Sequence, residues 1–294
     1  MNKVQIITDS CADLAKDLRD KNGIDYVKMN VVHNEKEQQA NLDWENISVK
    51  EFYDEIRKGE RFLTTQVPVQ EFESVFTKYL EMGCDVVYVG CSLKLSASVS
   101  VGKKVAEQLK EKYPNNEIYC VDSCNSCMGE GLLAIKATEF RDMGLSAKEI
   151  SEKVYSIRNN VNQFCTVHTL DALRRAGRVK GSSAFFGNLF GVKPIIISDV
   201  EGNNAPIKKV KGRQTSLKEL VNLTKESIID AENQIIYIAH ADCLDEAVAL
   251  KEQIMNEIKC KGVYIGYIGP IIGASVGADA IAVFSFGKAV EFGG

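Results

Sequence analysis

The sequence predicts a two-domain α/β protein, with an N-terminal doubly wound parallel sheet and a C-terminal α/β domain that has a mixed sheet. The chain of 294 residues is longer than the size at which one hydrophobic core usually splits into two. Short apolar strands alternate with amphipathic helices through the first half, a pattern typical of a parallel sheet with right-handed crossovers. The pattern changes near residue 162, so we expect domains at 1–161 and 162–294.

The N-terminal half should form its sheet from segments rich in apolar and β-branched residues. One helix has a clear start signal, because Ser48 and Glu51 form a capping box. Ligands of such sheets bind at the carboxyl ends of the strands. The expected strands are 3–8, 24–31, 84–90 and 116–121, and the expected helices are 12–21, 48–58, 69–82, 98–112, 126–142 and 146–160.

The C-terminal half combines a hairpin with crossover connections. Pro194 belongs at the start of a strand over 193–197, because proline donates no hydrogen bond to a ladder. The polar residues 201–204 are typical of a hairpin turn that leads into a return strand at 205–211. The other expected elements are strands at 164–167, 234–239, 262–268 and 279–286, and helices at 170–175, 215–230 and 243–258.

Charge and composition exclude several classes of protein. A net charge of −4 gives no electrostatic basis for binding nucleic acid or an anionic membrane surface. No apolar run approaches the roughly 20 residues that span a bilayer, and the first residues read as a strand and its turn, not as a signal peptide. Nine cysteines, several inside expected strands, are typical of free thiols in a reducing compartment. We therefore expect a soluble cytoplasmic protein.

Three hydroxyl-rich segments are candidates for binding an anionic head group. They are Thr64-Thr65-Gln66, the loop that contains Leu95-Ser96-Ala97, and the segment 273–277 with Ser275. Neutral hydroxyls and free backbone N–H groups at strand ends suit a small anion. They suit proton chemistry poorly, because an unassisted hydroxyl does not titrate near neutral pH. The pattern therefore favours binding over turnover.

Alternative chemistries have weaker support. The segment 273–277 matches the G-x-S-x-G elbow of serine hydrolases, in which the acid and the histidine follow the serine. All three histidines of this chain precede Ser275, so a hydrolase that uses Ser275 or Ser96 is a minor alternative.

The cysteine spacing and a basic run each allow two interpretations. Cys120, Cys124 and Cys127 have a C-x3-C-x2-C spacing found in iron–sulfur sites, but Cys120 falls inside an expected strand. We expect no metal and no cofactor. The basic run 174–180 fits either a solvated helix end or a grip on an acidic partner or a phosphate, and the sequence leaves both open.

An ordered set of short segments, each weak alone, is specific in combination. In their order and spacing they resemble the DegV family, the fatty-acid-binding subunits of bacterial fatty acid kinases, over essentially the whole chain. The segments are Thr8-Asp9-Ser10, Thr64-Thr65-Gln66, Leu95-Ser96, Asp122-Ser123 with 128–131, 173–179, Lys193-Pro194-Ile195 and 269–274.

The resemblance implies a non-catalytic protein that holds a long-chain fatty acid in a buried tunnel at the interdomain cleft. A separate ATP-dependent kinase subunit would then make the acyl phosphate. The carboxylate would be held in the turn of Thr64 and Thr65 and by Ser96. The kinase would be contacted by basic side chains, namely Arg175, Arg178 and Arg213.

The chain departs from the family pattern at the head group. The segment G-A-H-x-G-P-G of the family reads GASVGAD at 273–279, so Ser275 replaces a histidine, and Asp279 would repel an anion if it faced the site. Ala97 replaces the glycine of L-S-G. A protein of the same fold that binds a different lipid or small ligand is therefore the main alternative. Phe185, Phe186, Leu189 and Phe190 could supply the apolar lining of the tunnel, and ordinary core packing is the favoured interpretation for any one of them.

Overall fold

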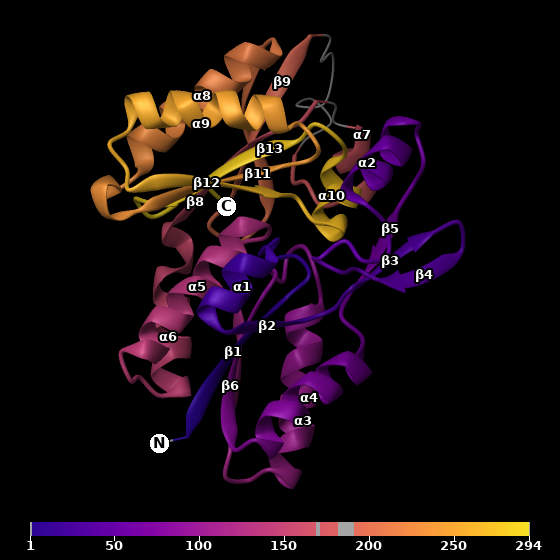
Figure 1. Ribbon diagram of the computed structural model, residues 1–294, viewed down its shortest axis with the longest axis vertical. Helices are drawn as coiled ribbons and strands as arrows, with labels where there is room; N and C mark the ends of the chain where they lie inside the picture. The colour runs from indigo at the N-terminus through magenta and orange to yellow at the C-terminus, as the bar shows by residue number, and fades with distance from the viewer. Residues whose placement is uncertain (1, 169–170, 182–190, 294) are drawn as a thin grey trace.

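Two larger sheets and one small sheet organise the protein in the computed structural model, which describes residues 2–168, 171–181 and 191–293. The two larger sheets lie one above the other, the C-terminal sheet uppermost in Figure 1, each with its own helices. The expected aromatic stretch 185–190 lies outside the described residues. No helix in the described part of the chain is long and apolar enough to cross a bilayer.

The N-terminal sheet is parallel throughout, as the alternation of strands and helices predicts. Its order is β2-β1-β6-β7. Helices α3 and α4 cover one face and α5 and α6 the other, so the sheet is doubly wound (Figure 1). The bounds are β1 Lys3–Asp9, α1 Lys16–Asn22, β2 Ile24–Val27, α3 Val69–Glu81, β6 Cys84–Gly90, α4 Ser98–Lys112, β7 Ile118–Asp122, α5 Met128–Asp142 and α6 Ala147–Ile157.

The expected strand 24–31 is instead two strands in two different sheets. Strand β2 ends at Val27 because the next two backbone N–H groups bond to side chains: Lys28 N donates to Glu71 Oε1 and Met29 N to Ser10 Oγ. The chain then enters a small antiparallel sheet of order β4-β3-β5. Its strands and the adjoining helix are β3 Asn30–His33, β4 Lys36–Gln39, α2 Val49–Arg57 and β5 Leu63–Thr65.

The C-terminal sheet is mixed, as expected. Its order is β10-β9-β8-β13-β11-β12, and the pair β11 and β12 is parallel whereas the other pairs are antiparallel. Helices α8 and α9 cover its outer face (Figure 1). The bounds are β8 Val161–Thr166, α7 Asp171–Ala176, β9 Val192–Ser198, β10 Asn204–Lys211, α8 Arg213–Ser227, β11 Ile235–His240, α9 Leu244–Glu257, β12 Gly262–Tyr267 and β13 Ile281–Phe286.

Alternate side chains of the C-terminal sheet enter two different cores. Ile195, Ile197 and Val283 pack with residues of α8 and α9. Ile196 and Phe284, on the opposite face, join the larger core that the N-terminal half builds. The inner face of this sheet therefore belongs to the same hydrophobic cluster as the strands of the other half.

The segment around Ser275 is a helix, whereas the sequence predicted a turn. Helix α10 spans Pro270–Val276. Proline at its first position removes an N–H group that would have no partner there, and Gly277, at a φ of 83°, ends the helix. Helix α10 packs against α7, α2 and the small sheet, so the C-terminal half contacts the N-terminal half on this side.

Candidate functional site

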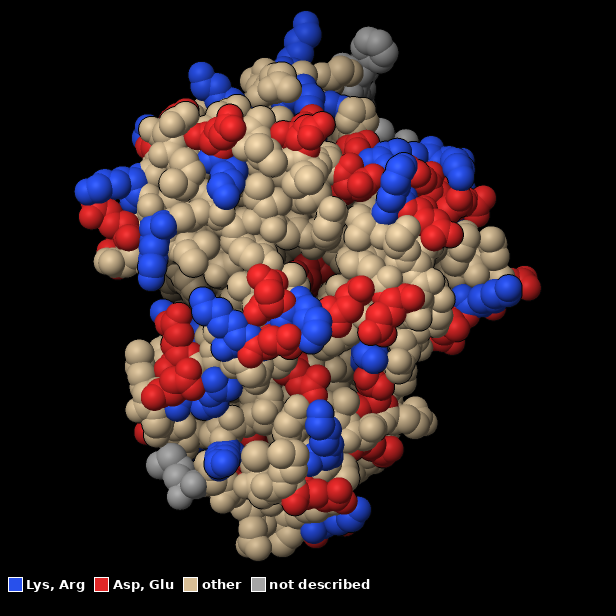
Figure 2. All heavy atoms as spheres, viewed as in Figure 1, with Lys and Arg blue, Asp and Glu red and all other residues tan. Residues whose placement is uncertain are grey.

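A cavity of about 470 Å³ lies between the N-terminal strand-end loops and the inner face of the C-terminal sheet. In Figure 2 the surface is hollowed where the two halves meet, with acidic and basic side chains around the rim. The apolar part of the cavity wall comes from both halves, and it includes Met29, Leu95, Cys165, Leu173, Ile196, Ile268, Ile271, Val276 and Phe284.

Three hydroxyl segments that are far apart in the sequence meet at this cavity. Thr64 on β5, Ser96 in the loop before α4 and Ser275 on α10 all line it. Ser98 joins two of these segments, because its Oγ lies 2.9 Å from Ser96 Oγ and accepts a hydrogen bond from Val67 N at 3.1 Å. Helix α10 packs directly on β5, which brings the third segment alongside.

The hydroxyl groups differ in whether they already form hydrogen bonds within the protein. Within the described part of the chain, Thr64 and Ser275 make no side-chain hydrogen bond, so both hydroxyls are available to a ligand. Thr65 also lines the cavity, but its Oγ1 lies 3.3 Å from Glu37 Oε1 and its side chain is exposed. Thr64 is therefore the better placed donor of the two.

Sequence reasoning missed Ser126. This serine follows β7 in the loop that leads into α5, lines the cavity and is 4% exposed. Its hydroxyl has no hydrogen-bond partner among the described residues. The strand-end rule could have found it, because the loop after β7 lies at the same carboxyl edge as Ser96.

The basic side chains are placed differently from one another. Arg178 lines the cavity, and Arg175 is exposed on α7. The expectation that Arg213 faces a partner does not agree with the structure, since its side chain is only 12% exposed and forms an ion pair with Glu246 at 2.6 Å. Arg213 Nη2 also donates a hydrogen bond to the carbonyl of Asp279, so the guanidinium is held by groups of the C-terminal half itself.

Asp279 does not face the cavity, so it does not repel an anion there. Its carboxylate pairs with Arg57 Nη2 at 2.7 Å, and Arg57 Nη1 also pairs with Asp242. Arg57 lies on α2, whereas both aspartates belong to the C-terminal half. These ion pairs therefore connect the two halves at the protein surface.

Buried acids lie beneath the cavity. Burial raises the pKa of Asp13 to about 8, and it also raises the pKa values of Asp9 and Glu130. Asp9 is held by Tyr88 Oη at 2.6 Å and by the backbone N–H groups of Cys11 and Cys91. A proton on Asp13 at neutral pH lowers the negative charge beneath a site that would hold an anion.

The described lining of the cavity does not offer the histidine that a serine hydrolase triad uses. No histidine is among the described residues that line it. His240 is buried elsewhere, where its Nδ1 accepts a hydrogen bond from Cys243 N and burial lowers its pKa to about 4. Among the described residues, Ser96 and Ser275 therefore have no histidine beside them to act as a general base.

All nine cysteines are free thiols. Cys120, Cys124 and Cys127, whose spacing is found in iron–sulfur sites, do not bring their sulfur atoms close enough together to hold a metal. Within the part of the chain that the structure describes, the donor atoms of Cys11, Cys91 and Glu130 form the one group close enough to hold a metal ion.

Comparison with known proteins identifies close relatives over the full length. A family model described as an uncharacterised protein of the DegV family matches residues 3–288. A DegV domain-containing protein of Clostridium perfringens is 34% identical over 291 residues, which is 99% of this chain and 100% of that protein. Protein DegV of Bacillus subtilis is 28% identical over 284 residues, covering 95% of this chain and 98% of that protein.

Solved structures share the fold. A fatty-acid-binding DegV family protein from Thermus thermophilus superposes with a TM-score of 0.87 at 22% identity, covering 98% of this chain and 100% of that chain. The structure of DegV from Bacillus subtilis, described as a fatty acid binding protein, gives a TM-score of 0.84 at 25% identity, covering 97% and 99%.

Proposed function

The chain belongs to the DegV family, and from that premise we propose that it binds a long-chain fatty acid in the cavity between its two sheets. The carboxylate would accept hydrogen bonds from Thr64, Ser96 and Ser275, with Ser126 nearby, and the hydrocarbon would lie against the apolar wall. The observation that carries the proposal is the presence, in one cavity, of unpartnered hydroxyls and many apolar side chains.

The hydrocarbon would supply most of the affinity. Each buried methylene contributes about 0.8 kcal/mol, so a sixteen-carbon chain contributes up to roughly 12 kcal/mol. Association costs about 4–15 kcal/mol, so only part of this gain appears as affinity. The polar groups would then fix the orientation of the ligand. Serine at position 275 offers one neutral donor, whereas the family pattern that the sequence resembles implies a histidine at this position.

A non-catalytic role follows from the chemistry of the lining. The described residues around the cavity supply hydroxyls, thiols, amides and the cationic side chains of Lys94 and Arg178, with no histidine or carboxylate among them. We therefore propose that the chain presents its fatty acid to a separate ATP-dependent kinase subunit that forms the acyl phosphate. Arg175, exposed on α7, and Arg178, at the edge of the cavity, would contact that subunit.

The ligand can be identified directly. Protein purified gently from a bacterial host should release close to one equivalent of fatty acid into organic solvent, as measured by mass spectrometry. A different lipid in the extract would support the alternative of the same fold with another ligand. Empty protein that binds neither palmitate nor oleate would exclude the proposal.

The head-group contact can be tested at Thr64, where Thr64→Val keeps the side-chain shape and removes the hydroxyl. Loss of a hydrogen bond to a charged group costs about 1.5–3 kcal/mol, which corresponds to a roughly 10- to 150-fold weaker Kd. Thr65→Val is the matched control, because that hydroxyl already bonds to Glu37. Equal affinities of the two variants would place the carboxylate elsewhere.

A test of the contact with the kinase subunit needs a variant that does not change the lining of the cavity. Arg175→Glu should abolish acyl-phosphate formation in the presence of the kinase subunit and ATP while fatty acid binding is retained. Lys148→Glu, on the exposed side of α6, is the control for the change in net charge. Full phosphorylation with Arg175→Glu would show that the partner binds another surface.

A further inference from the structure

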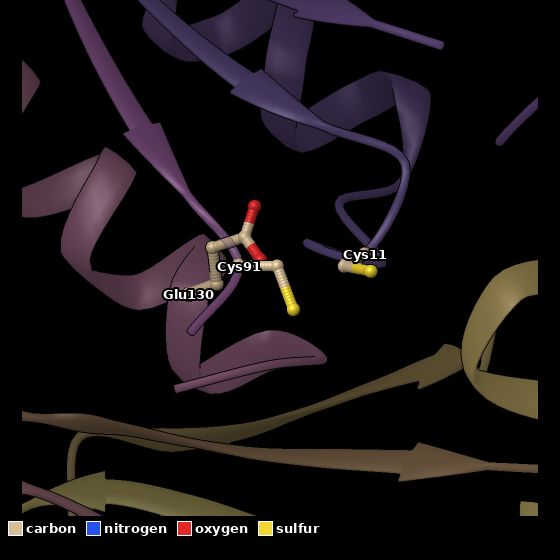
Figure 3. Close-up of side chains that lie close together, drawn as sticks. All are labelled: Cys11, Cys91 and Glu130. Carbon is tan, nitrogen blue, oxygen red and sulfur yellow. The ribbon is translucent and has the colours of Figure 1, made fainter. Parts of the chain in front are cut away.

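A second cluster lies at the base of the same cavity, and the proposed fatty acid site does not use it. It consists of Cys11 in the loop after β1, Cys91 in the loop after β6 and Glu130 on α5 (Figure 3). One donor atom from each side chain lies within 4.8 Å of the other two, and all three side chains are buried. The carboxyl edge of the parallel sheet brings these elements together.

The carboxyl group of Glu130 is only half satisfied. Its Oε1 accepts hydrogen bonds from Thr8 Oγ1 at 2.7 Å and from Asp9 N at 3.4 Å. Its Oε2 is buried and has no hydrogen-bond partner among the described residues. A buried acceptor without a partner is unfavourable, so this free oxygen indicates a position that a ligand can fill.

We propose that Cys11, Cys91 and Glu130 bind one thiophilic divalent cation of the Zn²⁺ class. Two Zn–S bonds of about 2.3 Å in tetrahedral geometry set the sulfur atoms about 3.8 Å apart, so donor atoms already within 4.8 Å need to move by no more than about 1 Å. The sulfur of Met29 lies 3.3 Å from Cys11 Sγ and adds a further soft donor at the edge of the site.

The charges and the route of entry are consistent with a cation. In the described part of the chain, neither Glu130 nor its neighbour Asp9 forms an ion pair with a lysine or arginine. On binding, two S–H bonds break and two metal–sulfur bonds form. The two thiol protons, together with any proton on Glu130, pass to the solvent, so the ion offsets the charge of two thiolates and one carboxylate. Cys11, Met29 and Cys91 all line the cavity, so an ion can enter without unfolding the protein.

Cobalt is a suitable probe, because Co²⁺ takes the same tetrahedral thiolate sites as Zn²⁺ and absorbs in the near ultraviolet when thiolates coordinate it. Reduced, chelator-free protein should develop this absorption up to one equivalent of Co²⁺ and lose it when Zn²⁺ is added. Cys11→Ser and Cys91→Ser should abolish the absorption, and Glu130→Gln should weaken Co²⁺ binding at least tenfold. Cys165→Ser is the matched control, since this thiol is also buried and lines the same cavity.

A measurement on the wild-type protein tests the proposal even if the variants fail to fold. Alkylation in the presence and absence of Zn²⁺, followed by peptide mass spectrometry, should show protection of Cys11 and Cys91 but not of Cys165. The proposal is overturned if stoichiometric Co²⁺ gives no thiolate absorption, if the absorption survives in Cys91→Ser, or if Zn²⁺ protects neither thiol. These results do not depend on which lipid occupies the cavity.

Discussion

Asp13 should make the stability of the protein depend on pH. This buried carboxyl accepts a hydrogen bond from Gly269 N at 2.9 Å, at the start of α10, while its other oxygen has no partner among the described residues. Burial raises its pKa from 3.8 to about 8. Asp13→Asn keeps the acceptor for Gly269 N and removes the titration.

The direction of the pH dependence follows from the number of protons that the folded and unfolded states bind. Between about pH 4 and pH 8 the unfolded chain has released the Asp13 proton whereas the folded chain retains it, so the unfolded state binds fewer protons. The contribution of Asp13 to the free energy of unfolding therefore falls as pH rises, by about 1.4 kcal/mol per pH unit. Between pH 5 and pH 7 the wild type should lose roughly 2–3 kcal/mol relative to Asp13→Asn.

Urea unfolding of both proteins at pH 5, 6, 7 and 8 measures this difference. The other buried acids titrate in both proteins, so the change of the difference with pH reports on Asp13. Asp245→Asn, at an exposed position on α9, should give a profile parallel to that of the wild type. If Asp13→Asn also runs parallel to the wild type, the carboxyl is ionised in the folded protein and the reasoning fails.

Two further changes test the site and the packing. Ser275→His should strengthen fatty acid binding more at pH 6 than at pH 8, because a protonated imidazole adds positive charge beside the carboxylate; equal affinities in titrations at both pH values would show that position 275 does not touch the head group. Gly131→Ala should lower the free energy of unfolding by about 1–3 kcal/mol, since its Cβ would lie 2.8 Å from the backbone oxygen of Ala12. Gly262→Ala, which meets nothing within 4 Å, is the control, and equal stability of these two variants in urea would contradict the argument.

Periodicity was enough to predict the regular parts of the fold. The buried strand β6 and the helices on both faces of the N-terminal sheet have clear apolar patterns. Ser48 caps its helix, with its Oγ accepting a hydrogen bond from Glu51 N, but the return bond of the predicted capping box, from Ser48 N to the Glu51 side chain, is not formed. Strand β4 has no such pattern, because all four of its residues, Lys36–Gln39, are polar and exposed. Its pairing with β3 comes from the chain reversal and not from an apolar face, so the small sheet was not predictable in this way.

Part of the lining of the cavity was predictable from strand ends, whereas contacts between distant segments of the chain were not. Thr64 and Ser96 lie in hydroxyl-rich segments that the topology brings to one edge, and the structure places both on one cavity. Arg213 was expected to contact a partner protein, but it pairs with Glu246, which lies 33 residues further along the chain. The meeting of Cys11 and Cys91, 80 positions apart, likewise depends on strand order, which no spacing in the sequence encodes.

Because the inner face of the C-terminal sheet packs into the core of the N-terminal half, the two halves are not independent folding units. Ile196, Ala282 and Phe284 come from the second half of the chain, yet they complete the hydrophobic core of the first half and form a wall of the cavity. Either half expressed alone would expose this apolar face and would lack part of the site. The cavity therefore lies inside one hydrophobic core that both halves of the chain build. An apolar molecule bound there would pack against the same side chains as the protein's own core residues do.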